Sequence, residues 1–434
     1  MTTPRKEVIY KLPLTQFPDD CDWPVQSLAT TAEVLGGGTP DTGVVEYWEP
    51  AEIPWATPTD ITGTEGNEIV RTERSISNAG LKQSTLIPEN SVLMTSRATI
   101  GAAKINREPM AINQGFAAFV PKPGYSTEYL FHLIEILKPT LVRLGAGTTF
   151  LETSRREIKK VLARVPVEDE QRRIAAALKL ADDAIAKAKA ELEATRELKR
   201  SLLRSLFVEG LSHPQGLHRS KWITCPAHWT IKPLRHFAKI TSGFTMGRDL
   251  SRHETVTVPY VTVVNVQDGR FELNNISSIE IKNEELNTDL LQYGDILMTE
   301  GGDRDKLGRG GMWREAIAPC SYQNHIFRVR LDIDEYKPEL FHFLIQTYQA
   351  KNYFYAHAKQ TSNLCTINSR ELKNWPVPIP PMPEQERMIE ALQAAEKQET
   401  AAMEKVEALQ QVKKSLLHNL LTGKIRIPEG ITHG

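Results

Sequence analysis

The sequence predicts an α+β protein in which two mixed α/β domains alternate with two long helices. Three observations lead to this prediction: a tandem repeat with a period of about half the chain, two long segments with heptad spacing, and intervening segments rich in Gly, Pro, Thr and β-branched residues. The chain has 434 residues, of which 40% are apolar and 25% are charged, and this length is enough for two or three domains with their own cores.

The repeat is clearest where each long helix is expected to begin. VPVEDEQRRIAAAL, from Val165, and IPPMPEQERMIEAL, from Ile379, align without a gap at an offset of 214, with six of fourteen positions identical. Weaker matches keep the same order upstream: DWPVQSLATTAEVLGGGTP from Asp22 with HWTIKPLRHFAKITSGFTM from His228, PWATPTD from Pro54 with PYVTVVN from Pro259, and YLFHLIEIL from Tyr129 with ELFHFLIQT from Glu339. The chain therefore contains two copies of one unit, each a globular part followed by a helix.

Each predicted helix has one apolar seam. The first helix, expected over 168–207, contains no Gly or Pro, and its apolar residues recur at the 3-4 spacing of a heptad. A single helix of this length needs a partner, so we expect the two seams to pack on each other. The residues predicted at this contact are the repeated Glu-Gln openings and the seams: Glu170, Gln171, Arg173, Leu178, Ile185, Leu192, Leu202, Glu384, Gln385, Arg387, Leu392, Val406, Leu409 and Leu416. Both seams also contain one lysine at the same place, Lys199 and Lys413.

The globular parts contain apolar segments that predict strands and amphipathic segments that predict helices. The expected strands are Ser91–Thr95, Gly115–Pro121, Asp295–Thr299 and His325–Leu331, and the expected helices are Ser126–Leu144 and Lys337–Ala358. The predicted division of the chain is 1–165 for the first domain, 166–210 for its helix, 211–378 for the second domain and 379–434 for the second helix.

The motifs of common enzymes are missing, which predicts a non-catalytic chain. GGGTP, from Gly36, lacks the lysine of a phosphate-binding loop and is interpreted as a structural turn, while LGAGTT, from Leu144, is a lone G-x-G. Glu280 and Lys282 form an E-x-K triplet of the nuclease type, but so short a motif arises easily by chance. The eleven histidines and four cysteines are scattered, so neither a metal site nor a disulfide framework is expected.

The composition also limits which cellular compartment and which ligands can be expected. No apolar run reaches the length of a membrane helix, and the first residues lack the pattern of a signal peptide. Scattered cysteines are typical of a reducing compartment, so we expect a cytoplasmic protein. Because the net charge is −1, a DNA-binding surface would need locally concentrated positive charge or a partner that supplies it.

The duplicated order of globular part and long helix resembles the specificity subunit of type I restriction-modification systems. The resemblance rests on PVEDEQRRIAAAL, PPMPEQERMIEAL and the ending SLLHNLLTGKIRI, and on GGGTPDTGVVEYWEPAEIPWATPTDI and LMTEGGDRDKLGRG in the globular parts. It covers nearly the whole chain. It implies that each globular part is a target-recognition domain for one half of a bipartite, asymmetric DNA sequence, and that the helices pack antiparallel and set the spacing.

The resemblance also implies the partners. Two methyltransferase subunits are expected to dock on the helix residues named above, and motor-nuclease subunits to join the complex through them. S-adenosylmethionine is then expected on the methyltransferase, and ATP with Mg on the motor-nuclease, with no cofactor in this chain. Double-stranded DNA is the expected ligand, and no membrane is involved.

Residues that contact DNA are expected in loops after strands, because such loops can bring polar and cationic side chains to phosphates and base edges. In the first domain the candidates are Ser96 and Arg97 in TSRATIG, with Thr57, Gln114, Thr148 and Thr149 near the repeated segments. In the second domain, EGGDRDKLGRGGMWR contains Arg304, Lys306, Arg309 and Arg314 among five glycines, and Gln323, Lys359 and Thr361 are further candidates. A solvated surface loop is an equally good interpretation of the second segment.

Two other functions fit the same sequence. One is a duplicated adaptor whose coiled coil assembles proteins without contacting DNA. The other is an orphan subunit that regulates a system without restricting DNA. Neighbouring reading frames for an adenine methyltransferase and a helicase-nuclease would favour the specificity subunit, and their absence would favour the alternatives.

Overall fold

The computed structural model describes residues 3–146, 152–211, 216–287, 290–302, 307–360 and 365–428. The chain forms two compact units, Met1–Ala190 with Glu404–Gly434, and Glu191–Met403. Each unit is a mixed α/β domain that includes about half of each long helix. The compact units therefore cut across the predicted division, which treats the helices as separate segments.

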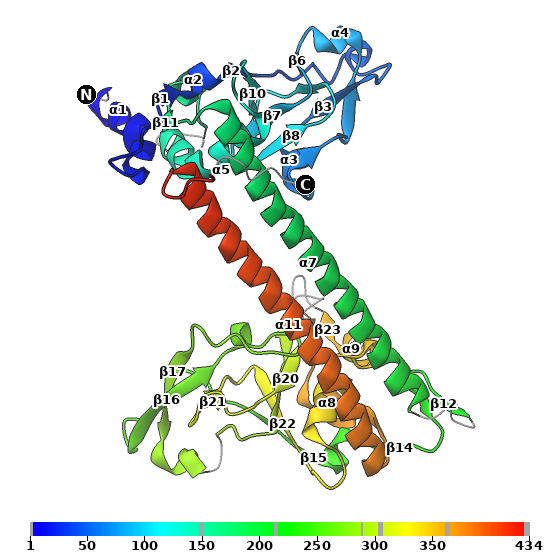
Figure 1. Cartoon of the computed structure of the whole chain (residues 1–434). Helices are drawn as coiled ribbons and strands as arrows, with labels where there is room; N and C mark the ends of the chain where they lie inside the picture. Colours follow the sequence, from blue (N-terminus) through cyan, green and yellow to red (C-terminus); the bar gives the residue numbers. More distant parts are fainter. Residues whose placement is uncertain are drawn as a thin grey trace. The chain divides into compact units, whose positions relative to one another are not determined.

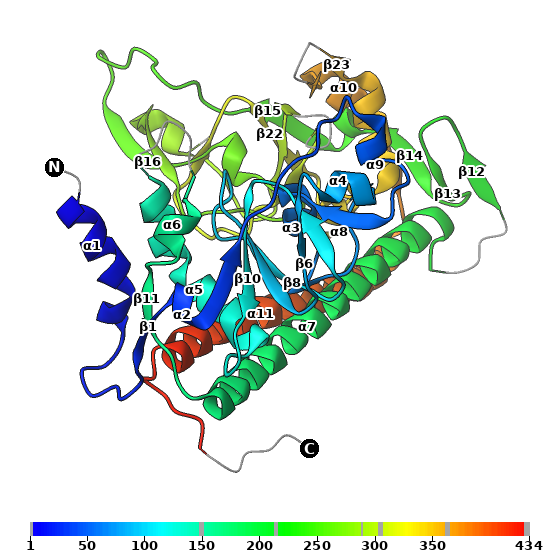
Figure 2. The ribbon, with the colours of Figure 1, turned by 90° about the horizontal axis from the view of Figure 1, so that it is seen from above.

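Two long helices, α7 (Glu168–Glu209) and α11 (Met382–Leu421), each contribute to both units, and within each unit their segments lie side by side and antiparallel (Figures 1 and 2). Glycines in the left-handed region end them, Gly210 with a φ of 74° and Gly423 with a φ of 69°. Most of the apolar residues at the predicted seam are buried: Leu178, Ile185, Ala188, Leu192 and Leu206 on α7, and Leu392, Ala395, Ala402, Val406 and Leu420 on α11. Leu202, Leu409 and Leu416 are half-buried.

The first unit contains two main sheets. Its strands are β1 (Val25–Ser27), β2 (Ala32–Leu35), β3 (Ile53–Ala56), β4 (Glu68–Ile69), β5 (Arg74–Ile76), β6 (Thr85–Ile87), β7 (Ser91–Thr95), β8 (Ala103–Asn106), β9 (Met110–Ile112), β10 (Phe116–Pro121) and β11 (Leu162–Arg164). The larger sheet has the order β2-β10-β7-β8-β4, and the smaller has the order β5-β3-β9-β6. Within the smaller sheet β3 and β9 run parallel, and β1 pairs separately with β11.

Short helices and one long helix complete the first unit. They are α1 (Thr3–Lys11), η1 (Leu12–Gln16), α2 (Leu28–Thr31), η2 (Val45–Tyr47), α3 (Pro58–Gly63), α4 (Asn78–Leu81), α5 (Thr127–Gly145) and α6 (Arg155–Ile158). The main core lies between α5 and the larger sheet, and it includes Ile174 and Leu178 of α7 and Leu420 of α11. The ends of the long helices are thus part of this domain's core.

The second unit repeats this topology. Its strands are β12 (Leu217–Arg219), β13 (Thr224–Pro226), β14 (Thr230–Pro233), β15 (Ala238–Ser242), β16 (Thr255–Val261), β17 (Ser277–Lys282), β18 (Ile296–Thr299), β19 (Gly301–Gly302), β20 (Gly310–Met312), β21 (Ser321–Tyr322), β22 (Ile326–Leu331), β23 (Lys359–Gln360), β24 (Cys365–Thr366) and β25 (Pro376–Ile379). The order β15-β22-β18-β20 matches β2-β10-β7-β8, and β16 runs parallel to β21 as β3 does to β9. A small sheet, β19-β24-β23, is present in this unit in addition.

The helices of the second unit are η3 (Leu234–His236), η4 (Val263–Asn265), η5 (Asn283–Asn287), α8 (Pro338–Leu344), α9 (Tyr348–His357) and α10 (Ser369–Asn374). The single helix predicted over Lys337–Ala358 is wrong, because the structure has two helices there. The hydroxyl of Thr347 accepts a hydrogen bond from the Ala350 N–H and starts a new helix at that point. The four strands predicted from apolar segments are confirmed as β7, β10, β18 and β22.

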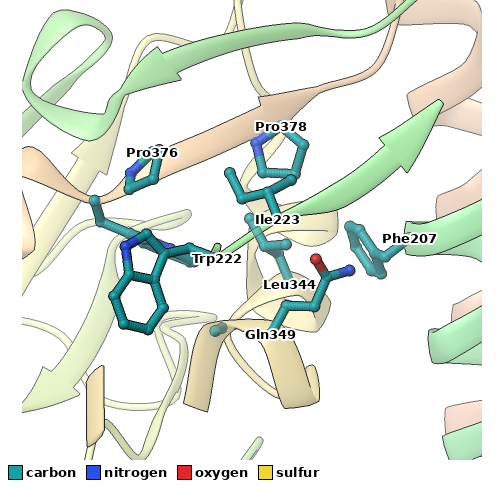
Figure 3. A pocket seen from close by; sticks show the side chains of 9 residues that line it. Phe207, Trp222, Ile223, Leu344, Gln349, Pro376 and Pro378 are labelled. Atoms are coloured by element: carbon teal, nitrogen blue, oxygen red, sulfur yellow. The ribbon is translucent and has the colours of Figure 1, made fainter. Parts of the chain in front are cut away.

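The core of the second unit is closely packed. A cavity of about 10 Å³ lies among Phe207, Trp222, Ile223, Leu344 and neighbouring prolines (Figure 3). This volume is close to the smallest that holds one water molecule.

Across the part of the chain that the structure describes, no helix is long and apolar enough to cross a membrane.

Burial of the seam predicts the effect of charges placed in it. Leu192 is 7% exposed and Val406 is 8% exposed, whereas Leu198 and Val412, on the same helices, are 59% and 51% exposed. Truncating a buried leucine costs about 2–5 kcal/mol, so Leu192→Asp and Val406→Asp should each lower the free energy of unfolding by at least about 3 kcal/mol. The control variants Leu198→Asp and Val412→Asp should change it by less than about 1 kcal/mol. Denaturant unfolding measures the free energy of unfolding of all four variants. An equal loss in the buried and the exposed variant of the same helix would contradict the assigned seam.

Candidate nucleic-acid interface

Each unit has a polar loop surface held by the same set of backbone hydrogen bonds. We define the first loop surface as residues 37–39, 57–60, 95–97 and 113–115, and the second as residues 243–245, 262–265, 299–301 and 323–325. Three N–H to O bonds hold the first: Gly38 to Ile112 (3.0 Å), Asn113 to Ala56 (3.1 Å) and Ser96 to Gly115 (2.7 Å). Their counterparts in the second are Phe244 to Tyr322, Gln323 to Val261 and Glu300 to His325, each at 2.9 Å. The backbone of the surface is therefore duplicated along with the sheets.

A glycine is required at one point of each surface. A Cβ atom on Gly37 would lie 1.8 Å from the Ile112 carbonyl oxygen, and one on Gly243 would lie 2.0 Å from that of Tyr322. No side chain fits such a close backbone approach. This contact supports the interpretation of GGGTP as a structural turn.

A threonine and an acceptor three residues later hold the loop after the parallel strand. The Thr57 hydroxyl donates to Asp60 Oδ2 (2.6 Å), and the Thr262 hydroxyl donates to Asn265 Oδ1 (2.7 Å). The hydroxyl of Thr57, predicted to contact DNA, therefore serves to hold the loop. Thr262 was missed by the prediction, although it aligns with Thr57 in the repeat of PWATPTD and PYVTVVN.

The first loop surface presents some of the predicted residues and buries one. Arg97 is exposed at the end of β7, with its Nε 2.9 Å from Glu152 Oε1, and Gln114 is exposed and accepts a hydrogen bond from the Thr39 hydroxyl. The prediction for Ser96 is wrong, because its side chain is only 4% exposed where the loop crosses Gly115. Thr148 and Thr149 lie outside the described residues.

The described candidates of the second unit lie on several different elements. Gln323 is half-buried, and its Oε1 accepts from the Val263 N–H at 3.0 Å, while Arg309 donates to Gln267 Oε1 at 3.0 Å. Lys359 is exposed on β23, and Thr366 of β24 pairs with it on one side and with Gly301 of the second loop surface on the other. The guanidinium of Arg314 lies 3.5 Å from Glu396 of α11, and its side chain is 46% exposed. Arg304, Lys306 and Thr361 fall outside the described residues.

The two surfaces carry different chemistry on the same backbone. At equivalent positions the first has Ser96 and Arg97, and the second has Glu300 and Gly301. Next to Glu300, His325 replaces the glycine of the first surface and donates from Nδ1 to the carboxylate at 2.9 Å. One surface thus presents a cation beside a half-exposed carboxylate, and the other presents a histidine–glutamate pair.

Arginines stacked on aromatic rings flank both surfaces. The Arg74 guanidinium lies 3.8 Å from the centroid of the Trp48 ring, and that of Arg248 lies 4.4 Å from Phe244. Arg248 also donates two hydrogen bonds to Glu285, at 2.7 and 3.0 Å, and these bonds lower the pKa of that carboxyl group against the opposing effect of burial. The aromatic contacts hold the cations in place at the protein surface.

The repeated Glu-Gln openings bind each long helix to its own domain. Gln171 accepts from the Ser126 N–H (3.0 Å) and donates to the Pro166 carbonyl (2.9 Å), and Gln385 does the same with Lys337 (2.9 Å) and Pro380 (2.9 Å). Glu170, Gln171, Glu384 and Gln385 are all buried. These residues are at most 7% exposed, so they offer little surface to another subunit, and their predicted role in docking stays a prediction. Of the two arginines in the same motif, Arg173 is half-buried and Arg387 is exposed.

The two buried glutamates each hold a tryptophan. Trp23 Nε1 donates to Glu170 at 3.2 Å, and Trp229 Nε1 donates to Glu384 at 3.0 Å. Arg426, which follows α11, completes the first cluster, with its Nη2 2.7 Å from Glu170 Oε2. Burial would raise the pKa of Glu384, but bonds from His228, the Leu211 N–H and Trp229 lower it overall. Each glutamate thus holds a tryptophan of its own unit.

The described residues contain no group of three or more His, Cys, Asp or Glu side chains placed to hold a metal ion.

The fold and the two loop surfaces define a class of protein with two related but chemically different binding domains attached to one pair of helices. The model of the type I restriction modification DNA specificity domain matches residues 21–194 and again residues 226–414. The chain belongs to this family, whose members are non-catalytic DNA-recognition subunits.

Individual relatives agree with the family. The MjaIX specificity subunit of Methanocaldococcus jannaschii is 26% identical over 417 residues, which cover 94% of each chain. The EcoR124I/EcoR124II specificity subunit of Escherichia coli is 28% identical over 174 residues, 38% of this chain and 42% of that protein. The fold is also that of the S subunit of a type I restriction-modification system from M. genitalium, with a TM-score of 0.51, 12% identity, and 93% and 97% of the two chains covered. A chain solved in a study of assembly in the type I system gives a TM-score of 0.58 at 14% identity and covers 94% and 99%.

The close approach at Gly37 predicts a selective loss in the first loop surface. Gly37→Ala should displace β9 or the turn and lower the free energy of unfolding of the first unit by at least about 2 kcal/mol. Gly63→Ala is the matched control, because nothing lies within 4 Å of its Cβ position. It should be neutral or stabilising, since alanine suits a helix better than glycine. Thermal unfolding distinguishes the two variants, and a neutral Gly37→Ala would contradict the assigned contact.

Proposed function

We propose that the chain reads an asymmetric, bipartite DNA target, with the first loop surface on one half and the second on the other. One observation carries the proposal: the two surfaces share their backbone hydrogen bonds but differ in their exposed side chains. A shared backbone presents each surface to DNA in the same way, whereas different side chains select different bases. Two like domains with unlike side chains therefore recognise two unlike half-targets.

The duplicated frame also supports the stoichiometry of the complex. Two similar helix-bearing units offer two similar docking sites, so two methyltransferase subunits bind one chain, and motor-nuclease subunits join through them in the cytoplasm. S-adenosylmethionine belongs to the methyltransferase, and ATP and Mg belong to the motor-nuclease. Since the Glu-Gln openings are buried, docking uses the exposed faces of α7 and α11 and the exposed Arg387.

Arg97 is the strongest single candidate for DNA contact. Its side chain is 46% exposed, and its salt bridge to the 39%-exposed Glu152 is open to solvent. An exposed pair of this kind contributes little to stability, so the guanidinium can exchange the carboxylate for a phosphate or a guanine edge at small cost. The exchange also leaves the buried Ser96 and its backbone bonds undisturbed.

Arg97→Ala should weaken DNA binding by the assembled methyltransferase complex without unfolding the chain. If the guanidinium contacts a base, the variant should lose about 1–3 kcal/mol of binding free energy. If it contacts a phosphate, the slope of log affinity against log salt concentration should be lower by about one. Fluorescence anisotropy over a range of salt concentrations separates these outcomes. Lys11→Ala removes an exposed cation from the last turn of α1 as a control and should leave the affinity unchanged. An unaltered affinity and salt slope in Arg97→Ala would contradict the role of Arg97.

Separate recognition by the two domains is tested by methylome sequencing of cells that express the chain with its methyltransferase. Wild type should methylate one bipartite asymmetric sequence. Glu300→Ser combined with His325→Gly gives the second loop surface the residues of the first at these positions, and should relax or change the bases of one half-target only. Arg97→Ala should affect the other half-target only. A change in both half-targets in either variant, as for a single continuous target, would contradict the proposal. No methylation by wild type would favour the adaptor.

A further inference from the structure

A histidine and a glutamate form a fixed pair at one end of the sheet β15-β22-β18-β20. The ladder of β18 with β22 ends with Thr299 opposite Ile326, and Glu300 and His325 are the next two residues beyond it. The Glu300 N–H donates to the His325 carbonyl oxygen at 2.9 Å. The side chains are joined as well, with His325 Nδ1 2.9 Å from Glu300 Oε2. Because an ionised carboxylate only accepts hydrogen bonds, Nδ1 carries a proton.

The small sheet β19-β24-β23 holds the backbone on the other side of Glu300. The Glu300 carbonyl oxygen accepts from the Ile367 N–H at 2.9 Å, and Gly301 pairs with Thr366 of β24. A Cβ atom on Gly301 would lie 2.9 Å from the Cys365 carbonyl oxygen, so a side chain there would displace β24. The backbone of Glu300 is thus held on both sides before any ligand binds, which lowers the cost of using its side chain for recognition.

The fold itself does not require this pair. In the first unit Ser96 and Gly115 occupy the same two places, and the same backbone bond joins them at 2.7 Å. The side chains of Glu300 and His325 are 33% and 61% exposed, and an exposed pair of this kind contributes little to stability. Among the described residues, none donates to the other carboxylate oxygen of Glu300, Oε1, and this oxygen is not buried. It is therefore available to a ligand.

A carboxylate fixed on a surface that faces DNA has few possible partners. The phosphates repel it, and the donors on base edges in the major groove are the N4 amino group of cytosine and the N6 amino group of adenine. Adenine also has the acceptor N7 next to N6, and the lone pair of N7 repels a carboxylate. Cytosine has no acceptor on this edge, so a carboxylate fits cytosine better than it fits any other base.

We propose that Glu300 accepts a hydrogen bond from the N4 amino group of a cytosine in the half-target of the second unit, and that His325 is the positioning residue that holds the carboxylate for it. This inference rests on the proposed function and deepens it, because it names one base of the target. The bond from His325 occupies Oε2 and leaves Oε1 for the base. The second half-target therefore contains at least one C·G base pair whose recognition depends on Glu300.

The variant Glu300→Gln tests the choice of base, because it keeps the shape of the side chain. A glutamine presents one acceptor and one donor, the pattern that fits N6 and N7 of adenine. Methylation by the complex of the chain with its methyltransferase is measured on a DNA library in which the first half-target and the gap are fixed and the second half-target is randomised. Wild type should prefer cytosine at least about tenfold at one position, and Glu300→Gln should lose this preference and accept adenine at that position alone. Unchanged preferences at every position, or a second half-target with no cytosine in either strand, overturns the proposal.

Removal of the amino group from the DNA tests the hydrogen bond itself. The cytosine is replaced by 2-pyrimidinone, which is cytosine without its 4-amino group, and wild type should methylate this DNA at least about tenfold less efficiently. Because the analogue also weakens the base pair, Glu300→Ala serves as the reference. This variant should be impaired on the cytosine DNA and lose much less than wild type when the amino group is removed. An equal loss in wild type and in Glu300→Ala would mean that the carboxylate does not contact the amino group, and would overturn the proposal.

Variants of His325 test the positioning role. His325→Ala should reduce the preference for cytosine at the same position and leave the other positions and the melting temperature unchanged, since the side chain is exposed. His325→Asn keeps an N–H donor and should restore part of the preference. Because the histidine acts through the glutamate, His325→Ala combined with Glu300→Ala should be no worse than Glu300→Ala alone. Losses that add in the double variant overturn the positioning role.

A matched control and the wild-type target separate this inference from the proposed function. Glu335 is an exposed carboxylate of the same unit, with its Oε2 2.7 Å from Lys232 Nζ, and Glu335→Gln should leave every base preference unchanged. No methylation of a bipartite target by wild type would overturn the proposed function and this inference together. A bipartite target whose cytosine preference is the same in Glu300→Gln as in wild type would overturn this inference alone and leave the proposed function standing.

Discussion

An apolar seam that runs the length of a forty-residue helix cannot remain in water, and the rest of the structure depends on how α7 and α11 cover each other. Each helix is also built into the core of a domain at both of its ends. Leu178 and Leu420 belong to the core of the first unit, and Phe207 and Leu392 belong to that of the second. The buried Gln171 and Gln385 then fix the direction in which each helix leaves its domain. The ends of each helix are therefore parts of the folded domains.

The division between backbone and side chain explains how one frame serves two different surfaces. Gly37 and Gly243 allow the close approach of two loops, and Thr57 and Thr262 hold the next loop with the same bond. These contacts do not involve the exposed side chains at positions such as Arg97 and Glu300. Substitution at the exposed positions can therefore change what a surface recognises and leave the strands and loops as they are.

The elements that could be predicted are those specified by local sequence. Heptad spacing and the glycines that end the helices predict α7 and α11, and apolar segments predict the strands β7, β10, β18 and β22. The order of strands in the sheets and the exposure of single residues depend on contacts between distant segments. Ser96 and Arg97 are neighbours in one loop, yet Gly115 and Thr153 cover the first and leave the second in solvent. The local sequence around Ser96 does not show which distant segments will cover it.

The repeat itself predicts which positions are equivalent, but it leaves the role of those positions open. A motif that occurs twice can serve a contact with two copies of a partner, or a contact that each copy of the fold makes within itself. Glu170 and Glu384 belong to the second kind, since each holds the tryptophan of its own domain. The partner of Arg314 could not be predicted for a related reason, because Glu396 lies 82 residues away in the sequence, on α11.

The contact of Arg426 with Glu170 and Trp23 affects the order in which the two units are completed during synthesis. The second unit is a continuous segment, and all of its parts are present once Met403 has left the ribosome. The first unit is made of an early and a late segment, and it lacks Leu420 and Arg426 until synthesis has passed beyond them. Domains commonly fold in the order of synthesis, the N-terminal one first. Here the order is reversed, because the domain that is translated first is the last to be completed, and an unfinished chain displays the bare seam of α7 until α11 emerges to cover it.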